Sequence, residues 1–78
     1  MSPEQCRAAR GWLDWSQQKL AKQAKVGLST VKDFENGSRK PIANNLGAIQ
    51  RAIEAAGIVL IDGEGGKPLG IKVADPAV

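Results

Sequence analysis

Apolar residues recur at helical intervals along most of the chain, and the spacing changes after residue 57. Residues three and four positions apart share one face of a helix, so this spacing predicts four helices. The run Ile58–Ile61 is dominated by β-branched residues and predicts a strand. A glycine-rich turn and a second apolar segment at 70–73 predict a hairpin that leans on the helices or pairs with another subunit. The pattern predicts a mostly α-helical fold with a short C-terminal β-strand or hairpin.

The expected helix ends carry capping signals. Ser2 and Gln5 have the spacing of a capping box, and Ser16 is a second N-cap candidate. Gly37 and Gly57 suit the position just after a helix, where glycine adopts a left-handed conformation easily. These signals predict a first helix that begins after Ser2 and ends near Asp14. Three further helices are predicted at residues 17–24, 28–36 and 42–56.

The third predicted helix has two unlike sides and follows a break of only three residues. A projection at about 100° per residue separates them. One side gathers Val31, Phe34 and Glu35, and the other gathers Ser29, Lys32, Asp33 and Asn36. Such a helix can pack on its neighbour and still present a polar face to a partner.

Positive charge is concentrated in the first half of the chain. The protein has 78 residues, enough for one small domain, and a net charge of +3. Residues 1–40 hold eight Lys and Arg against four acids, whereas residues 41–78 hold three against four. The charge next to the helical pair favours an anionic partner, although a solvated surface is the simpler alternative.

Several functional classes lack the residues they need. The chain has no histidine and a single cysteine, Cys6, which we expect to be a small core residue. We therefore expect no enzyme activity, no metal site and no cofactor. No apolar run approaches the ~20 residues of a membrane span, and Met1–Gln5 lacks a signal-peptide layout, so we expect a cytoplasmic protein. Trp15 is expected in the core, and Trp12 is expected to pack rather than stack on bases.

These features together resemble the lambda-repressor-like (Cro/Xre-type) helix-turn-helix family. The resemblance covers about residues 2–57. It rests on Arg10, Trp15-Ser16-Gln17, Leu20-Ala21, Ala24, Val26, Ser29-Thr30-Val31 and Phe34-Glu35-Asn36-Gly37. It implies a four-helix DNA-binding domain with a buried structural ion pair between Arg10 and Glu35. The expected organisation is a helix-turn-helix domain at 1–57, a β extension for dimerisation at 58–73 and a flexible tail at 74–78.

The chain departs from the family in four places. Lys25 stands where the family usually has glycine, so a left-handed turn there would strain a lysine. Gly27 replaces a capping Ser or Thr, and Leu28 replaces a frequent polar base reader. The strand at 58–61 takes the place of the fifth helix, so the family's usual dimer contact is not expected.

Two sets of DNA contacts are expected, both from the same half of the chain. Base contacts fall to the outward side of the third helix, where Asp33 is alternatively a surface residue or a partner of Lys32. Phosphate contacts position the domain without reading the sequence. The expected base contacts are Leu28, Ser29, Lys32 and Asp33, and the expected phosphate contacts are Gln17, Thr30, Asn36, Arg39 and Lys40.

The leading hypothesis is a sequence-specific transcriptional regulator, most simply a homodimeric repressor that reads an inverted repeat in double-stranded DNA through helix 28–36. The expected dimerisation residues are Ile58, Val59, Leu60 and Ile61, with pairing through the fourth helix as the alternative. A second hypothesis is a protein-interaction module, such as an antitoxin that neutralises a partner protein and binds DNA secondarily.

Overall fold

The computed structural model describes residues 1–74 and has the predicted architecture, four helices followed by an antiparallel hairpin. The second, third and fourth helices each begin and end within one residue of their predicted bounds. A short 3-10 turn at Glu64–Gly66 joins the two strands. The elements are α1 (Pro3–Leu13), α2 (Gln17–Ala24), α3 (Leu28–Glu35), α4 (Ala43–Ala55), β1 (Ile58–Asp62) and β2 (Pro68–Val73).

The predicted capping signals are present. The Ser2 hydroxyl accepts from the Gln5 amide at 3.1 Å, and the Gln5 side chain accepts from the Ser2 amide at 2.8 Å, which completes a capping box at α1. At α2 the Ser16 hydroxyl accepts from the Lys19 amide at 2.9 Å. Gly37 follows α3 with a φ of 77°. These local bonds set where each helix starts and stops.

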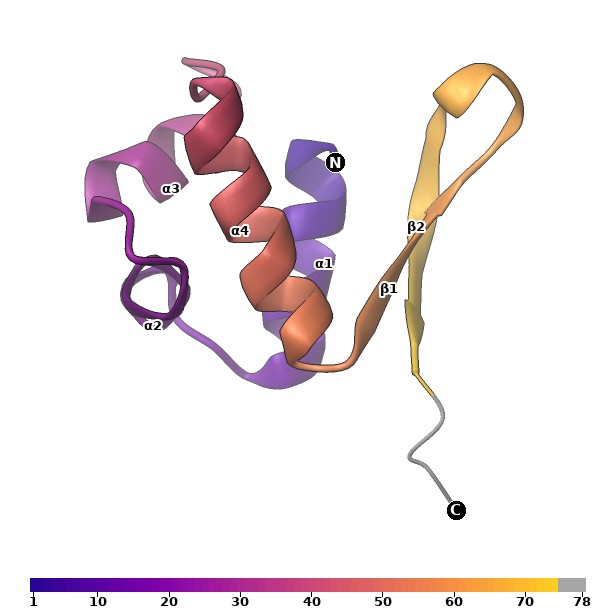
Figure 1. The fold of residues 1–78 in the computed structure, drawn as a ribbon, viewed down its shortest axis with the longest axis horizontal. Coiled ribbons are helices and arrows are strands. Elements are labelled where there is room, and N and C mark those ends of the chain that lie inside the picture. The colour runs from indigo at the N-terminus through magenta and orange to yellow at the C-terminus, as the bar shows by residue number, and fades with distance from the viewer. Residues whose placement is uncertain (75–78) are drawn as a thin grey trace.

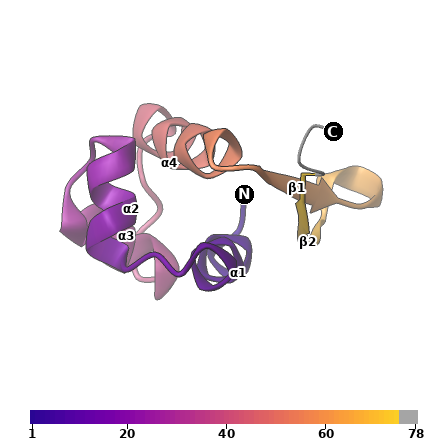
Figure 2. The same cartoon turned by 90° about the horizontal axis from the view of Figure 1, so that it is seen from below.

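The core lies between the four helices and one end of the hairpin. Figures 1 and 2 show α1 and α4 in the middle, α2 and α3 on one side and the hairpin on the other. Apart from Leu20, the buried apolar side chains on α1 and α2 are small, which lets those helices approach their neighbours. The buried apolar residues are Cys6, Ala9, Leu20, Ala21, Ala24, Val31, Phe34, Ile49, Ile53 and Ile58.

Gln5 fastens the hairpin to α1. Its side chain is buried, and its amide nitrogen lies 3.1 Å from the Ile61 carbonyl of β1 and 3.0 Å from the Gly70 carbonyl of β2. A buried amide without partners would be costly, so these bonds both satisfy Gln5 and hold the two strands against the helix. The hairpin therefore leans on the helices, one of the two arrangements that the sequence leaves open.

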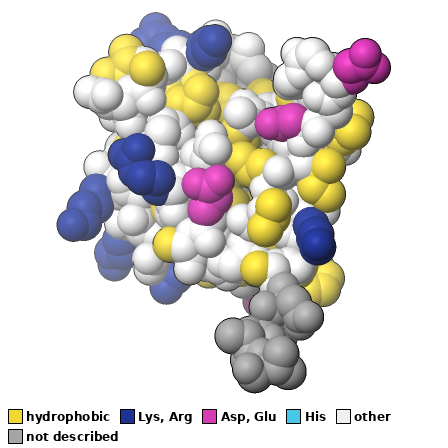
Figure 3. Space-filling view, turned by 45° about the vertical axis from the view of Figure 1, so that its right-hand side comes forward, with side chains coloured by type: hydrophobic (Ala, Val, Ile, Leu, Met, Phe, Trp, Pro, Cys, Tyr) yellow, Lys and Arg dark blue, Asp and Glu magenta, His cyan; other side chains and the backbone are white. Residues whose placement is uncertain are grey.

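The hairpin buries only one of its sides. Ile58 is 2% exposed and belongs to the core, and Leu60 packs partly against it. Of the residues expected to form the dimer, Ile58 is covered by its own chain and offers almost no exposed surface to a partner. Side chains at alternate positions point outward: Val59 is 45% and Ile61 38% exposed. Figure 3 shows hydrophobic side chains along this side, while most Lys and Arg side chains lie over the helices.

Two further expectations concern Trp12 and the tail. Trp15 is half-buried against the core as expected, but Trp12 is 64% exposed, so the expectation that it packs is wrong. Trp12 falls on the outer side of α1 because the inner side is already filled by Cys6 and Ala9. Apart from Ala74, the predicted flexible tail at 74–78 lies outside the described residues.

Candidate nucleic-acid interface

The turn between α2 and α3 brings the two helices together at a close crossing. Ala21 and Ala24 are buried on α2, and the Val26 amide donates to the Ala21 carbonyl at 3.0 Å to close the corner. Lys25 has a φ of 59°, the left-handed conformation that the resemblance implies and that a side chain disfavours. The turn thus has the left-handed geometry that the resemblance implies. Because Lys25 and not glycine occupies this position, the turn carries some backbone strain.

Glu35 anchors the C-terminal end of α3 to the rest of the helical body. Arg10 donates two hydrogen bonds of 2.7 Å each to the Glu35 carboxylate, from Nε to Oε2 and from Nη2 to Oε1. The structure thus brings together the two residues whose pairing the resemblance implies. Such a two-point contact fixes orientation as well as charge.

Three other side chains converge on Glu35, and no pattern in the sequence predicts their contacts. Gln17 Nε2 donates to Oε1 at 3.0 Å, and the Cys6 thiol donates to Oε2 at 3.1 Å. Arg7 donates to the Glu35 main-chain carbonyl. Together with Arg10, these groups tie α3 to both α1 and α2. The base of α3 is thereby held rigidly from the inner side.

The bonds at Glu35 shift the pKa values of the groups involved. Burial by itself would raise the pKa of Glu35, but the hydrogen bonds from Arg10, Gln17 and Cys6 outweigh it and leave the pKa below its ordinary value. The hydrogen bond to Glu35 raises the pKa of Arg10. Burial, and then the bond to Glu35, raise the pKa of the Cys6 thiol. The pair is therefore ionised and the thiol protonated at neutral pH, which gives Cys6 a structural role.

The opposite side of α3 is open to solvent. Ser29 and Lys32 are exposed, and Thr30 and Asp33 are half-buried. Leu28 also lies at the margin, where part of its side chain packs against the core. The four residues expected to read bases therefore fall on one continuous strip of α3, with Ser29 and Lys32 the most accessible.

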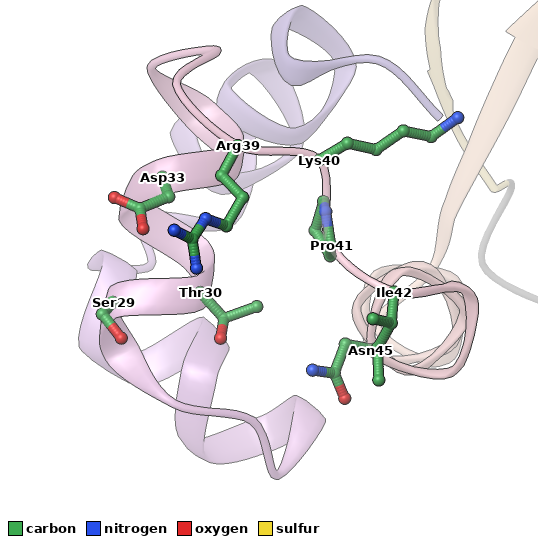
Figure 4. Close-up of a pocket in the computed structure, with 8 residues that line it drawn as sticks. All are labelled: Ser29, Thr30, Asp33, Arg39, Lys40, Pro41, Ile42 and Asn45. Atoms are coloured by element: carbon green, nitrogen blue, oxygen red, sulfur yellow. The ribbon is translucent and has the colours of Figure 1, made fainter.

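A shallow hollow of about 220 Å³ separates α3 from the start of α4. Figure 4 shows Ser29, Thr30 and Asp33 on one side of it and Ile42 and Asn45 of the α4 start on the other. No side chain caps the first turn of α4. The loop 36–42 closes one end of the hollow and brings in Arg39 and Lys40.

The residues expected to contact phosphates differ in how exposed their side chains are. Arg39 and Lys40 are exposed in the loop after α3, and Thr30 lines the hollow. The Asn36 side chain accepts from the Ser38 amide at 2.8 Å and so helps to shape this loop. Gln17 is half-buried, and one of its amide hydrogens is donated to Glu35.

No described part of the chain offers a metal centre or a membrane span. Residues 1–74 contain no group of three or more acidic or cysteine side chains placed to hold a metal ion. None of the helices within the same residues combines the length and hydrophobicity that crossing a bilayer requires.

Comparison with known proteins gives one positive finding. A helix-turn-helix family model matches residues 7–54, which include most of α1, all of α2 and α3, and nearly all of α4. No curated protein matches the chain. The matched segment contains the turn, the Glu35 anchor and the open strip of α3, and it stops before the hairpin.

Proposed function

Because the chain belongs to the lambda-repressor-like, Cro/C1-type helix-turn-helix family of DNA-binding regulators, we propose that it is a dimeric repressor that reads an inverted repeat through α3. One observation carries this proposal. The inner side of α3 is fixed through Glu35, while Ser29 and Lys32 on its outer side are exposed to solvent. A rigid helix with a free polar side can enter the major groove without rearrangement.

Each group near α3 has a place in this arrangement. Ser29 and Lys32 reach the base edges, and Leu28 offers an apolar surface for a thymine methyl group. Thr30, Asn36 and Lys40, with the second amide hydrogen of Gln17, contact the phosphates beside the groove. Unpaired amides in the first turn of α4 face the same backbone, where the helix dipole favours an anion.

A second copy of this chain is the partner that best fits the outer side of the hairpin. Val59 and Ile61 are exposed there, and both strands of the two-stranded sheet keep one edge unpaired. Val73 pairs with the buried Ile58 and so shares the inner face of the hairpin, and Leu69 lines a hollow together with Gln5 and Ala8 of α1. An unpaired edge beside exposed apolar side chains favours association, so Val59 and Ile61 support a hairpin-mediated dimer.

The position of the hairpin bears on the spacing of the half-sites. It lies on the opposite side of the molecule from α3, along the 36 Å longest dimension (Figures 1 and 2). Two copies joined end to end through their hairpins would hold their α3 helices further apart than one turn of DNA, about 34 Å. A dimer formed through α4 would bring them closer. The spacing of the half-sites thus distinguishes the two modes of dimerisation.

The proposal is tested by measuring affinity for duplex DNA as a function of salt concentration. Each neutralised phosphate releases counterions, so the affinity should fall steeply as salt rises. Lys40→Gln should reduce the slope of log affinity against log salt by about one. Lys67→Gln is the matched control, because Lys67 is an exposed lysine beside the hairpin turn, and it should leave the slope unchanged.

The alternative of a protein-interaction module rests on the exposed apolar side of the hairpin, which suits another protein as well as a second copy. A chain that copurifies 1:1 with a different protein and has no DNA affinity at low salt would overturn the repressor proposal. An unchanged slope in the Lys40→Gln variant would remove Lys40 from the DNA contacts.

A further inference from the structure

Arg39 and Lys40 are adjacent basic residues, yet their side chains point in different directions. In Figure 4 the Arg39 side chain runs back along α3, and its guanidinium faces the hollow beside Thr30 and Asp33. The Lys40 side chain extends away from α3 in the same view. The two charges therefore meet different parts of any duplex that α3 enters.

The backbone explains why Arg39 returns to α3. The Asp33 carbonyl accepts from the Ser38 amide at 3.0 Å and from the Arg39 amide at 3.3 Å. These bonds fold the loop onto the C-terminal turn of α3 and place the start of the Arg39 side chain next to Asp33. From there a long side chain reaches the N-terminal half of α3, where base readers of this helix type are found.

We propose that Arg39 reads a guanine in the major groove and that Asp33 orients its guanidinium. This inference rests on the proposed function and changes the role of one residue within it. A guanidinium donates two parallel hydrogen bonds to the O6 and N7 atoms of guanine, which is the commonest specific contact to a base. The expected phosphate contact at Arg39 is replaced by a contact that carries sequence information.

The charges support this assignment. A carboxylate at Asp33 faces an anionic groove, where it is unfavourable unless a cation accompanies it. Of the two basic residues that line the hollow with Asp33, Arg39 is the one whose side chain points toward α3. Across residues 1–74 the one ion pair joins Arg10 to Glu35, so Arg39 and Asp33 share the hollow without a salt bridge, and the guanidinium keeps its donors free for DNA. Asp33 thereby acts on Arg39 through its charge, as a positioning residue.

The experiment is a selection of bound duplexes from random DNA, followed by affinity measurements on the selected site and on its single-base variants. The proteins compared are the wild type, Arg39→Gln, Arg39→Lys and Lys40→Gln. Arg39→Gln and Lys40→Gln remove the same charge from neighbouring positions, so they form a matched pair. Arg39→Lys keeps the charge but loses the planar pair of donors.

The wild type should require a guanine at one position of each half-site. Both Arg39 variants should lose that preference by roughly 5- to 150-fold while the other positions stay unchanged. Lys40→Gln should weaken binding to all sequences alike and keep the motif. If Arg39→Gln weakens every sequence equally and keeps the guanine preference, Arg39 is a phosphate contact and the inference is overturned while the proposed function stands.

The role of Asp33 is tested by a double-mutant cycle at the same base pair. Asp33→Asn should weaken the guanine preference in the wild type and have no further effect in Arg39→Gln, because the two residues act together. Additive effects would mean that Asp33 reads a base on its own. If the wild type selects no motif at all, the proposed function itself fails, which separates the two outcomes.

Discussion

The helical body and the hairpin bury their surfaces in different ways. The four helices enclose most of their apolar side chains and pair the buried Glu35 with Arg10, Gln17 and Cys6. The hairpin packs one side on the body and leaves Val59 and Ile61 exposed on the other. The first region is complete within one chain, whereas the second presents a surface that a partner would cover.

Core residues of the helical body and residues on the outer side of the hairpin are therefore expected to respond differently to substitution. In the helical body a substitution acts on the subunit itself, because each core residue is surrounded by its own chain. On the outer side of the hairpin a substitution acts on association and leaves the subunit almost unchanged. The two effects are measured separately, by unfolding and by oligomeric state.

The largest effect is expected from Arg10→Met in the helical body. Loss of the guanidinium leaves a buried carboxylate without its cation, so the free energy of unfolding should fall by about 3–5 kcal/mol. Urea denaturation measures this change. Arg51→Met is the matched control, because Arg51 is exposed on α4, and it should change stability by less than about 0.5 kcal/mol. Equal effects of the two variants would show that Glu35 does not anchor α3.

The next effect contrasts two isoleucines on opposite sides of β1. Ile58→Ala removes a fully buried side chain and should lower the free energy of unfolding by about 2–5 kcal/mol. Ile61→Lys places a charge on the outer side, so it should leave the subunit folded and weaken the dimer at least about tenfold. Analytical ultracentrifugation measures the dimer, and urea denaturation measures the subunit.

Lys72 offers the control for that contrast. It is exposed on β2 opposite Val59, so Lys72→Ala keeps the hairpin and does not add a charge to the proposed interface. If Ile61→Lys and Lys72→Ala leave association equally unchanged, the hairpin is not the dimer interface, and α4 becomes the remaining candidate.

A smaller effect is expected in the pH dependence of stability. The pKa of Glu35 is lowered in the folded protein, so the unfolded chain takes up the proton first as pH falls. The stabilisation by the Arg10–Glu35 pair is therefore complete above the ordinary glutamate pKa of about 4.3 and is lost as pH drops through the lowered value. The difference in unfolding free energy between wild type and Glu35→Gln should shrink over this acid range. A constant difference would contradict the assignment.

The smallest effect concerns the turn before α3. Lys25 holds a left-handed conformation with a φ of 59°, which glycine adopts without strain. Lys25→Gly should raise the free energy of unfolding by up to about 1 kcal/mol. Lys25→Ala keeps the strain and removes the charge, so it should bring no gain. A gain in both variants would assign the effect to the charge of Lys25.

The sequence predicts those parts of the molecule that depend on local signals. Ser2, Ser16 and Gly37 mark helix ends because their bonds or backbone angles involve only neighbouring residues. The separation of Glu35 from Ser29 around α3 likewise follows from the period of a helix. The pairing of Arg10 with Glu35 came from the family resemblance, since spacing alone does not join residues on separate helices.

What the sequence missed depends on contacts between distant segments. Alternation along β1 says that Ile58 and Leu60 share a side but not which side faces the helices. Gln5 was read as a capping residue, and nothing in the sequence indicated that its amide also holds the hairpin. The direction of Arg39 follows from how the loop folds onto the Asp33 carbonyl, which is a property of the folded backbone.

The most direct test of the account is an NMR titration of the protein with the duplex obtained by selection. The amide signals of the α3 residues Ser29 and Lys32, and of the loop at 38–42, should shift on binding. Those of the outer hairpin, Val59 and Ile61, should keep their positions. Shifts confined to the hairpin, with the α3 signals unmoved, would contradict the claim that α3 is the part of this molecule that meets DNA.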